Sequence, residues 1–542
     1  MVNAAVENSA VDVLVDDSGR LGALAYLVDP AMTLAPGDAV TVPFGKAERH
    51  GLVLGPANEP AKASRTVLRR LGQRVDPVDM RLAFELAEHH FASITHVASR
   101  LSPSSGRNST PIDTGDVRLV PRRNDVTLPV PDRNWANRIY LRPPLLSPAR
   151  IAALEALRLS AGGQVLILAP TVKMLEAVLS EFESGAARLD SKARAGSWNG
   201  WRAGSVRIGI GTRSAAFYSA SHLGGIVVVE EEHPGHLEAS IPYLHARDVA
   251  RRRAALHNCP LSLVSAAPSA EGMKGCKVIA FDNPARHWPR IAVASRADLH
   301  PTQRTLPPAA RSVLSSTSLP IVAVAENGPS RRVCSRCRDP RPCGDCQGFC
   351  SHRPTGECAR CGTVGVHWIG WDKPRIAHLL PNATALTLAE LAAAKEEPRV
   401  VVFLNVDPLL RAASLHPLQD ATSVLTRAAS AAGRGGTLLL IGDDLDHPVL
   451  AGFTAKDAVS LAKGVWDAAR AAKLPPFGRL VTLRSSNATA PKVTSWPGRV
   501  FGPRRRAGEW EVLALVSDAE LDILRPLLER LRSRGKTRVS VQ

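Results

Sequence analysis

From Ala149 onward, short apolar runs alternate with stretches whose apolar residues recur at helical spacing. The runs are QVLILAP, VRIGIGT, GIVVV and LSLVSAAPS, and later RVVVFLNVD and GTLLLIGDD. Strands that are buried on both faces read as nearly continuous apolar runs, and a strand–helix–strand order places such strands parallel in one sheet. The pattern therefore predicts a multidomain α/β protein with two α/β lobes, the second one interrupted by a cysteine-rich segment.

The segments outside the two lobes differ in composition. Residues 11–55 hold four short apolar runs between turn-rich sequences, which predicts a small β-rich domain. Residues 78–102 have helical spacing, whereas 104–148 are rich in Ser, Asn, Asp, Arg and Pro and are interpreted as a linker or the remnant of a domain. Residues 473–542 mix strands with one helix and predict a compact α+β domain at the C-terminal end.

The charge balance favours a polyanionic partner. The 542 residues contain 68 Lys+Arg against 50 Asp+Glu, which gives a net charge of +18. A surplus of this size is typical of nucleic-acid-binding proteins, and the alternative is a merely Arg-rich, solvated surface. No apolar run approaches the about 20 residues that span a bilayer, and the N-terminus lacks a signal-peptide pattern. We therefore expect a cytoplasmic protein without a membrane partner.

Seven of the nine cysteines fall within CSRCRDPRPCGDCQGFCSHRPTGECARCG. Each C-x-x-C turn points two thiolates at one ion, and two such turns complete a tetrahedral zinc site. The segment offers eight ligands, enough for two zinc ions, against the alternative of free thiols. The favoured nested pairing puts Cys334, Cys337, Cys358 and Cys361 on one zinc. The other zinc then takes Cys343, Cys346, Cys350 and His352.

The stretch GIVVVEEEH, residues 225–233, is a buried strand that runs into three carboxylates. P-loop ATPases use such a strand end to hold magnesium, together with a glycine-rich loop whose amides wrap the phosphates. The residues before QVLILAP, PARIAALEALRLSAGG, contain no such loop. We therefore expect that ATP and Mg²⁺ do not bind, and that Glu230 and Glu231 belong to a degenerate site.

The order of several motifs resembles the family of the primosomal replication-restart protein PriA. GTRSAAF, VEEEH, YLHARDVARRRA and SAAPSAE resemble motifs of its first lobe, and LTRAASAAGR, which ends in Arg434, resembles one of its second lobe. KLPPFGRL resembles the entry to the family's C-terminal domain. The departures match the shortened actinobacterial type that lacks helicase motifs: Glu230 stands for an Asp and Ala431 for an Arg.

The N-terminal part resembles the family's 3′-end DNA-binding domain. Tyr26 and the sequence VPFG, which ends in Gly45, match, whereas Leu24 and Ala25 stand where the family has Phe and Asp. Arg65 falls about where that pocket has a lysine. The resemblance implies that Tyr26, Gly45, Lys46 and Arg65 contact DNA.

The resemblance also implies two degenerate RecA-like lobes and a zinc-ribbon-like insertion. The predicted domains are the DNA-binding-like domain 1–103, the first lobe 149–275, the second lobe 276–333 with 363–472, the zinc-binding insertion 334–362 and the C-terminal domain 473–542. Residues 104–148 connect the first two. The expected function is primosome assembly at forked, 3′-ended or single-stranded DNA by a monomer without helicase activity, near the nucleoid. Implied partners are replication-restart proteins, a helicase loader and single-strand-binding protein. The alternatives are an ATP-dependent 3′-to-5′ helicase and a zinc-stabilised protein scaffold.

Overall fold

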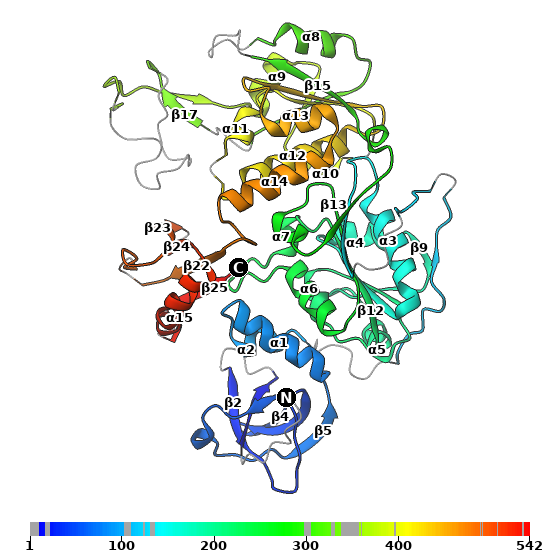
Figure 1. Ribbon diagram of the computed structural model, residues 1–542, viewed down its shortest axis with the longest axis vertical. Coiled ribbons are helices and arrows are strands. Elements are labelled where there is room, and N and C mark those ends of the chain that lie inside the picture. The colour runs from blue at the N-terminus through cyan, green and yellow to red at the C-terminus, as the bar shows by residue number, and fades with distance from the viewer. Residues whose placement is uncertain are drawn as a thin grey trace.

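The computed structural model describes most of the chain. The described residues are 10–16, 22–101, 110–122, 125–129, 136–193, 195–296, 305–326, 331–337, 357–358, 360–394, 397–412, 414–487, 489, 491–506, 508–533 and 536–542. Figure 1 shows two α/β lobes, with the N-terminal domain below the first lobe and the C-terminal domain beside both. Within the described residues, no helix combines the length and the apolar character needed to cross a membrane.

The N-terminal domain is a five-stranded antiparallel sheet followed by two helices, as its composition predicts. In spatial order the strands are β2 (Ala23–Leu27), β1 (Ala10–Val15), β4 (Ala47–Pro56), β3 (Asp38–Phe44) and β5 (Arg69–Gln73). Alternate residues such as Val11, Val13, Val40 and Val42 form the core of this domain. The turn η1 (Pro60–Lys62) follows β4.

The single helix predicted over 78–102 is two helices, α1 (Pro77–His89) and α2 (Ile94–Ala98). Asp76 caps α1 by accepting from the Val78 amide, and Pro77 suits its first turn. The helix ends because Phe91 takes a left-handed φ of 59°. Phe91 packs into the core of the C-terminal domain and His90 Nδ1 lies 2.9 Å from the Val541 carbonyl oxygen. Tertiary contacts therefore override a continuous local pattern.

The first lobe is a seven-stranded sheet in which every recorded pairing is parallel. Its order is β10 (Ala186–Arg188), β11 (Ile208–Gly211), β8 (Gln164–Leu168), β12 (Leu223–Val229), β13 (Leu261–Ser265), β7 (Asn137–Leu141) and β14 (Lys277–Ala280). Along β8, Val165 and Ile167 pack in one core and Leu166 and Leu168 in the other. Both faces are thus buried, as the apolar runs predict.

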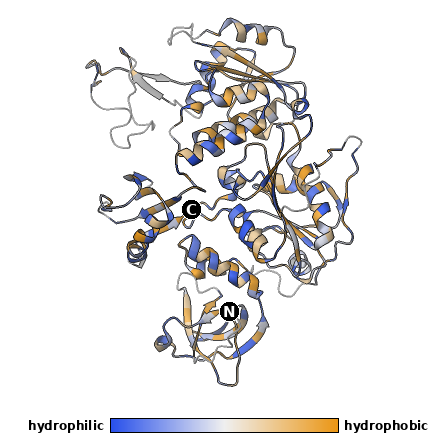
Figure 2. Cartoon of the chain, in the orientation of Figure 1, coloured by the Kyte–Doolittle hydropathy of each residue, from blue (hydrophilic) through white to orange (hydrophobic). Residues whose placement is uncertain are grey.

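Helices cover both faces of this sheet. They are α3 (Pro148–Leu159), α4 (Val172–Leu179), α5 (Ala195–Ala203), α6 (Ala246–Leu256) and α7 (Ala270–Met273), with short 3₁₀ turns η2 (Ser160–Gly162), η3 (Arg213–Phe217) and η4 (Pro234–His236). Figure 2 shows hydrophilic and hydrophobic residues mixed along the outer helices, such as α6. One face of such a helix packs on the sheet while the other meets solvent.

Residues 104–148, interpreted as a linker or remnant, contribute to the first lobe where the structure describes them. Strand β7 is an inner strand of the sheet, and β6 (Arg118–Leu119) pairs with β9 (Phe182–Ser184). The Val120 amide donates to the Glu181 carbonyl at 2.9 Å. The lobe therefore starts before the predicted boundary at 149, and β14 carries it beyond 275.

The second lobe is a five-stranded parallel sheet. Its order is β15 (Arg290–Ser295), β21 (Thr437–Gly442), β20 (Val400–Phe403), β16 (Ile321–Val324) and β19 (Ala383–Leu386). Around it lie η5 (Pro284–His287), α8 (Pro308–Ser315), α9 (Lys373–Leu379), α10 (Leu388–Ala393), α11 (Asp407–Leu410), α12 (Pro417–Ala432), α13 (Pro448–Ala455) and α14 (Ala458–Ala471). The hairpin of β17 (Arg331–Cys334) and β18 (Val366–Ile369) projects from this lobe and carries the cysteine segment (Figure 1).

The C-terminal domain is an antiparallel sheet with one helix. The strand order is β23 (Arg499–Arg506), β24 (Glu509–Val516), β22 (Arg479–Ser485) and β25 (Thr537–Val541), and the helix is α15 (Asp518–Ser533). Leu521, Leu524 and Leu528 of α15 pack on the apolar face of this sheet.

Helix α1 joins the N-terminal domain to the first lobe through two ion pairs with α6. Asp79 and Arg253 are fully buried, with 3.3 Å between Asp79 Oδ1 and Arg253 Nε. Glu85 and Arg252 form the other pair at 3.8 Å, with about a third of each side chain exposed. Removing one member of a buried pair leaves an uncompensated charge, whereas an exposed pair contributes little.

We expect Asp79→Ala to destabilise the α1–α6 contact by about 3–5 kcal/mol. The substitution leaves the Arg253 guanidinium buried without its carboxylate. Amide hydrogen exchange in α1 and α6 measures this local opening. Glu85→Gln is the matched control in the same contact and should cost no more than about 1 kcal/mol. Equal protection in the Asp79→Ala variant and the wild type would contradict this assignment.

Candidate functional site

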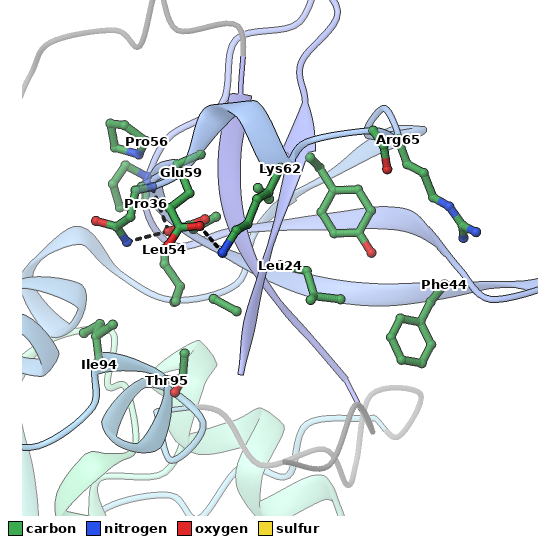
Figure 3. Close-up of a pocket in the computed structure, with 18 of the residues that line it drawn as sticks. Leu24, Pro36, Phe44, Leu54, Pro56, Glu59, Lys62, Arg65, Ile94 and Thr95 are labelled. Carbon is green, nitrogen blue, oxygen red and sulfur yellow. Dashed lines mark hydrogen bonds and ion pairs between the residues drawn. The ribbon is translucent and has the colours of Figure 1, made fainter. Parts of the chain in front are cut away.

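A cavity of about 960 Å³ lies in the N-terminal domain, between the edge of its sheet and helices α1 and α2. Figure 3 shows side chains from β2, β3, β4 and the segment after β4 turned towards it. Tyr26, Gly45 and Arg65, three of the four predicted DNA contacts, line this cavity together. Lys46 is exposed on the adjacent β3–β4 turn and is not among the lining residues.

One end of the cavity combines aromatic side chains with a guanidinium. Arg65 Nη1 donates to the Gly45 carbonyl at 3.0 Å, and the Tyr26 hydroxyl donates to the Pro43 carbonyl at 3.1 Å. Burial raises the pKa of Tyr26, and the charge of Arg65 opposes that shift. Gly45 has a φ of 61°, and a Cβ there would meet nothing within 4 Å. Glycine therefore serves the backbone turn and leaves the rim open.

The other end of the cavity holds a carboxylate that the sequence analysis missed. Asp12 is 9% exposed, and its Oδ2 accepts from the amide and the side chain of Asn58 at 3.1 and 2.6 Å. Asp12 lies directly opposite Ala25 in the β1–β2 pairing, so both residues point to the same face. The sequence signal was an aspartate inside the apolar strand VDVLV.

The wall between the two ends carries an ion pair between Glu59 and Lys62 (Figure 3). Both side chains are mostly exposed, at 60% and 75%. Such a pair is weakly held, so Lys62 can turn towards an anion entering the cavity.

A second candidate site lies at the carboxyl ends of β7 and β12 in the first lobe. Strand β7 leads through residues 142–147, which we call the Arg142 loop, into helix α3. This strand–loop–helix unit faces the glutamates after β12, because Arg142 Nη2 donates to Glu230 Oε1 at 2.9 Å. A phosphate-binding loop lies at this place, between the end of a strand and the start of the next helix, and faces such carboxylates. The sequence RPPLLS stands there, before α3 rather than directly before β8.

The chemistry of the Arg142 loop is opposite to that of a phosphate cradle. Pro143 and Pro144 of the loop, and Pro148 at the start of α3, have no amide hydrogen to donate. Arg142 is 4% exposed, and its Nη1 donates to the carbonyls of Pro143, Pro144 and Leu146 at 3.4, 3.1 and 3.2 Å. The loop thus directs its carbonyl oxygens towards the Arg142 guanidinium.

The remaining glutamates of this site also have partners within the protein. Glu231 is fully buried and accepts from Arg247 Nη1 at 2.9 Å and from the Ser269 amide at 2.7 Å. A Cβ at Gly272 would lie 2.4 Å from Glu231 Oε1, so α7 packs directly against this carboxylate. Glu232 accepts from the Ser265 hydroxyl at 2.7 Å. Burial, and then the charges of Glu231 and Glu230, raise the pKa of Glu232 to about 8.

The predicted second-lobe member of the degenerate site, Arg434, lies in the exposed turn between α12 and β21. It affects the pKa of His287, which burial and the charges of Arg286 and Arg434 lower. The second lobe instead reaches the Arg142 loop through α12, where the Ser430 hydroxyl donates to the Pro144 carbonyl at 2.8 Å. Glu230 and Glu231 are therefore brought together, and no contact between Arg434 and either one is recorded among the described residues.

The outer set of predicted metal ligands converges in one cluster. Cys334, Cys337, Cys358 and Cys361 have their sulfur atoms within 4.8 Å of one another. The Cys334–Cys361 and Cys337–Cys358 sulfur distances are 3.4 and 3.6 Å. Zinc–thiolate bonds of about 2.3 Å place the sulfurs of a tetrahedron about 3.8 Å apart, so the cluster could hold a zinc ion. Hydrogen bonding to Thr363 lowers the pKa of Cys361 to about 6, which favours the thiolate.

The inner set, Cys343, Cys346, Cys350 and His352, lies outside the described residues. The prediction of a second ion therefore stays a prediction.

Comparisons with known proteins point to one family. A replication restart protein PriA of Synechocystis sp. is 36% identical over 124 residues, which are 21% of this chain and 15% of that protein. A probable replication restart protein PriA of Mycobacterium tuberculosis is 29% identical over 281 residues, 43% of this chain and 42% of that protein. Each match spans less than half of the relative.

Among solved structures, the DUF1998 helicase MrfA bound to DNA overlaps 72% of this chain and 53% of its own, with 12% identity and a TM-score of 0.33. A likeness this distant decides neither fold nor function. Residues 12–103 match the family model described as the 3′DNA-binding domain of PriA. The chain is therefore similar to replication restart proteins PriA, and its N-terminal part matches the model of that family's 3′DNA-binding domain.

Proposed function

We propose that this protein recognises forked or 3′-ended DNA and supports primosome assembly during replication restart, without acting as a helicase. The observation that carries the proposal is the cavity of the N-terminal domain, which lies within the part matched to the PriA 3′DNA-binding domain. It offers a guanidinium at one end and a carboxylate at the other. A DNA end presents the complementary pair, a phosphate and a hydroxyl.

The proposed binding mode assigns one role to each end of the cavity. Arg65, with Lys46 at the rim, neutralises the terminal phosphodiester, and the half-buried Phe44 offers a surface on which the last base stacks. Asp12 Oδ2 is occupied by Asn58, whereas no hydrogen bond to Oδ1 is recorded among the described residues. Oδ1 can accept from a terminal 3′-hydroxyl. Asp12 thus supplies a carboxylate beside Ala25, the position at which the PriA family has an Asp.

The absence of a motor is supported by the Arg142 loop. Phosphoryl transfer from ATP depends on backbone amides and a metal ion that stabilise the developing negative charge. The two loop prolines, Pro148 at the start of α3, the inward carbonyls and a Glu230 that already has a partner offer neither. Binding energy for DNA therefore comes from contacts, not from ATP turnover.

The cysteine hairpin is proposed to be a zinc-stabilised module with two ions, the outer one on Cys334, Cys337, Cys358 and Cys361. Its projection away from the lobes (Figure 1) suits a surface for other proteins of replication restart, such as a helicase loader or single-strand-binding protein. We propose that it acts as a monomer in the cytoplasm, at the nucleoid.

We expect the protein to bind a fork with a 3′-hydroxyl at the branch at least about tenfold more tightly than the same fork with a 3′-phosphate, because a hydrogen bond to a carboxylate is worth roughly 1.5–3 kcal/mol. Asp12→Asn should reduce this discrimination, because the phosphate no longer faces a carboxylate. Fluorescence anisotropy with both forks measures it.

Two controls distinguish recognition of the 3′ end from nonspecific electrostatic attraction to DNA. Glu48→Gln removes the same charge from the exposed part of β4 outside the cavity and should keep the discrimination. Arg65→Ala should weaken both forks and reduce the salt slope of log K by about one. Equal affinity of the wild type for both ends would contradict 3′-end recognition, and a flat salt dependence would favour a scaffold that barely touches DNA.

Metal analysis of the purified protein should find two zinc ions per chain. Cys358→Ser should lose the outer ion, and Cys346→Ser the inner one, because each removes one thiolate of a four-ligand set. Cys276→Ser, at a half-buried cysteine of the first lobe, is the control and should keep both. One ion in the wild type would contradict the nested pairing, and none would contradict the zinc assignment.

A further inference from the structure

The two α/β lobes are in direct contact at the Arg142 loop. Ser430 of α12 donates to the Pro144 carbonyl, and the Leu145 amide donates at 3.0 Å to the carbonyl of His287, in the crossover to the second lobe. Leu141 and Met273 of the first lobe share a hydrophobic core with second-lobe residues such as Val406 and Phe453. The loop is therefore part of the interface between the lobes.

Arg142 determines the shape that this loop presents. Its Nη1 lies within hydrogen-bond reach of three loop carbonyls, and its Nη2 fixes the guanidinium to Glu230 at the end of β12. The Pro144 carbonyl accepts from Arg142 at 3.1 Å and from Ser430 at 2.8 Å, so one oxygen joins the Arg142 guanidinium of the first lobe to α12 of the second. A carbonyl oxygen has two lone pairs and can accept both bonds.

We propose that Arg142 is an internal cation that locks the two lobes in one closed arrangement. Nucleotide-driven machines close their domains around a ligand and open them when it leaves. A guanidinium that belongs to the chain is covalently attached and cannot leave. The two lobes therefore stay in contact at the Arg142 loop and form one rigid platform behind the DNA-binding domain. The lock builds on the proposed absence of a motor but is a separate claim about geometry.

The test measures the distance between the lobes. Dyes are attached through non-natural amino acids at two exposed positions, Val172 of α4 and Val459 of α14, because native cysteines are present in the chain. Single-molecule energy transfer should give one narrow distribution in the wild type, unchanged by Mg²⁺ and ATP. Arg142→Ala should broaden it and shift it towards longer distances, because the loop carbonyls and Glu230 lose their shared donor.

Arg138→Ala is the matched control, because Arg138 is a buried arginine of β7, the strand before the loop, and lies 3.7 Å from Glu155 inside the first lobe. It should leave the distribution unchanged. Ser430→Ala removes only the α12 side of the contact and should shift the distribution in the same direction as Arg142→Ala, so the test stands even if Arg142→Ala does not fold.

Unchanged distances in both Arg142→Ala and Ser430→Ala would overturn the lock. If both variants keep the wild-type distances and the wild type hydrolyses no ATP, the lock is wrong but the proposed function still stands. A wild-type distribution that moves on addition of Mg²⁺ and ATP would overturn the lock and the absence of a motor together.

Discussion

The Arg142 guanidinium and the Glu230 carboxylate meet at the carboxyl ends of the first-lobe strands β7 and β12. Ligands of open α/β sheets bind outside this edge of the sheet. Here the carboxylates after β12 already have partners in the chain, and the loop before α3 directs carbonyls inward. Buried carboxylates are costly unless they have partners, and Arg142 and Arg247 provide such partners for Glu230 and Glu231.

The cavity and the Arg142 loop lie in different parts of the fold. The cavity of the N-terminal domain is built from its own strands and from α1 and α2, with no residue from either lobe. Helix α1 then contacts α6 through Asp79 and Arg253, and the C-terminal domain through His90. Under the proposed function, a DNA end held in the cavity would be placed in a fixed relation to the lobes and to the C-terminal domain.

Local patterns predicted those parts of the fold whose signals are local. The apolar runs located β8, β11, β12 and β13 of the first lobe and β20 and β21 of the second, and the C-x-x-C spacing identified the four cysteines that converge. Strand β7 was missed because NRIYL is short, polar at its start and followed by prolines, and only pairing with β13 and β14 makes it a strand. The break at Phe91 depends on contacts with the C-terminal domain, far away in the sequence.

The candidate sites show the same limit. The sequence shows no phosphate-binding loop before QVLILAP, but it did not reveal the arginine that pairs with Glu230, because only the fold brings Arg142 to Glu230. In the sequence, Asp12 is one polar residue in an apolar strand. Only the β1–β2 pairing shows that it lies opposite Ala25. Calorimetric titration of the metal-loaded protein with a non-hydrolysable ATP analogue and Mg²⁺ tests the central claim most directly. No saturable binding is predicted; saturable binding that ADP displaces and that Glu231→Gln abolishes would contradict it.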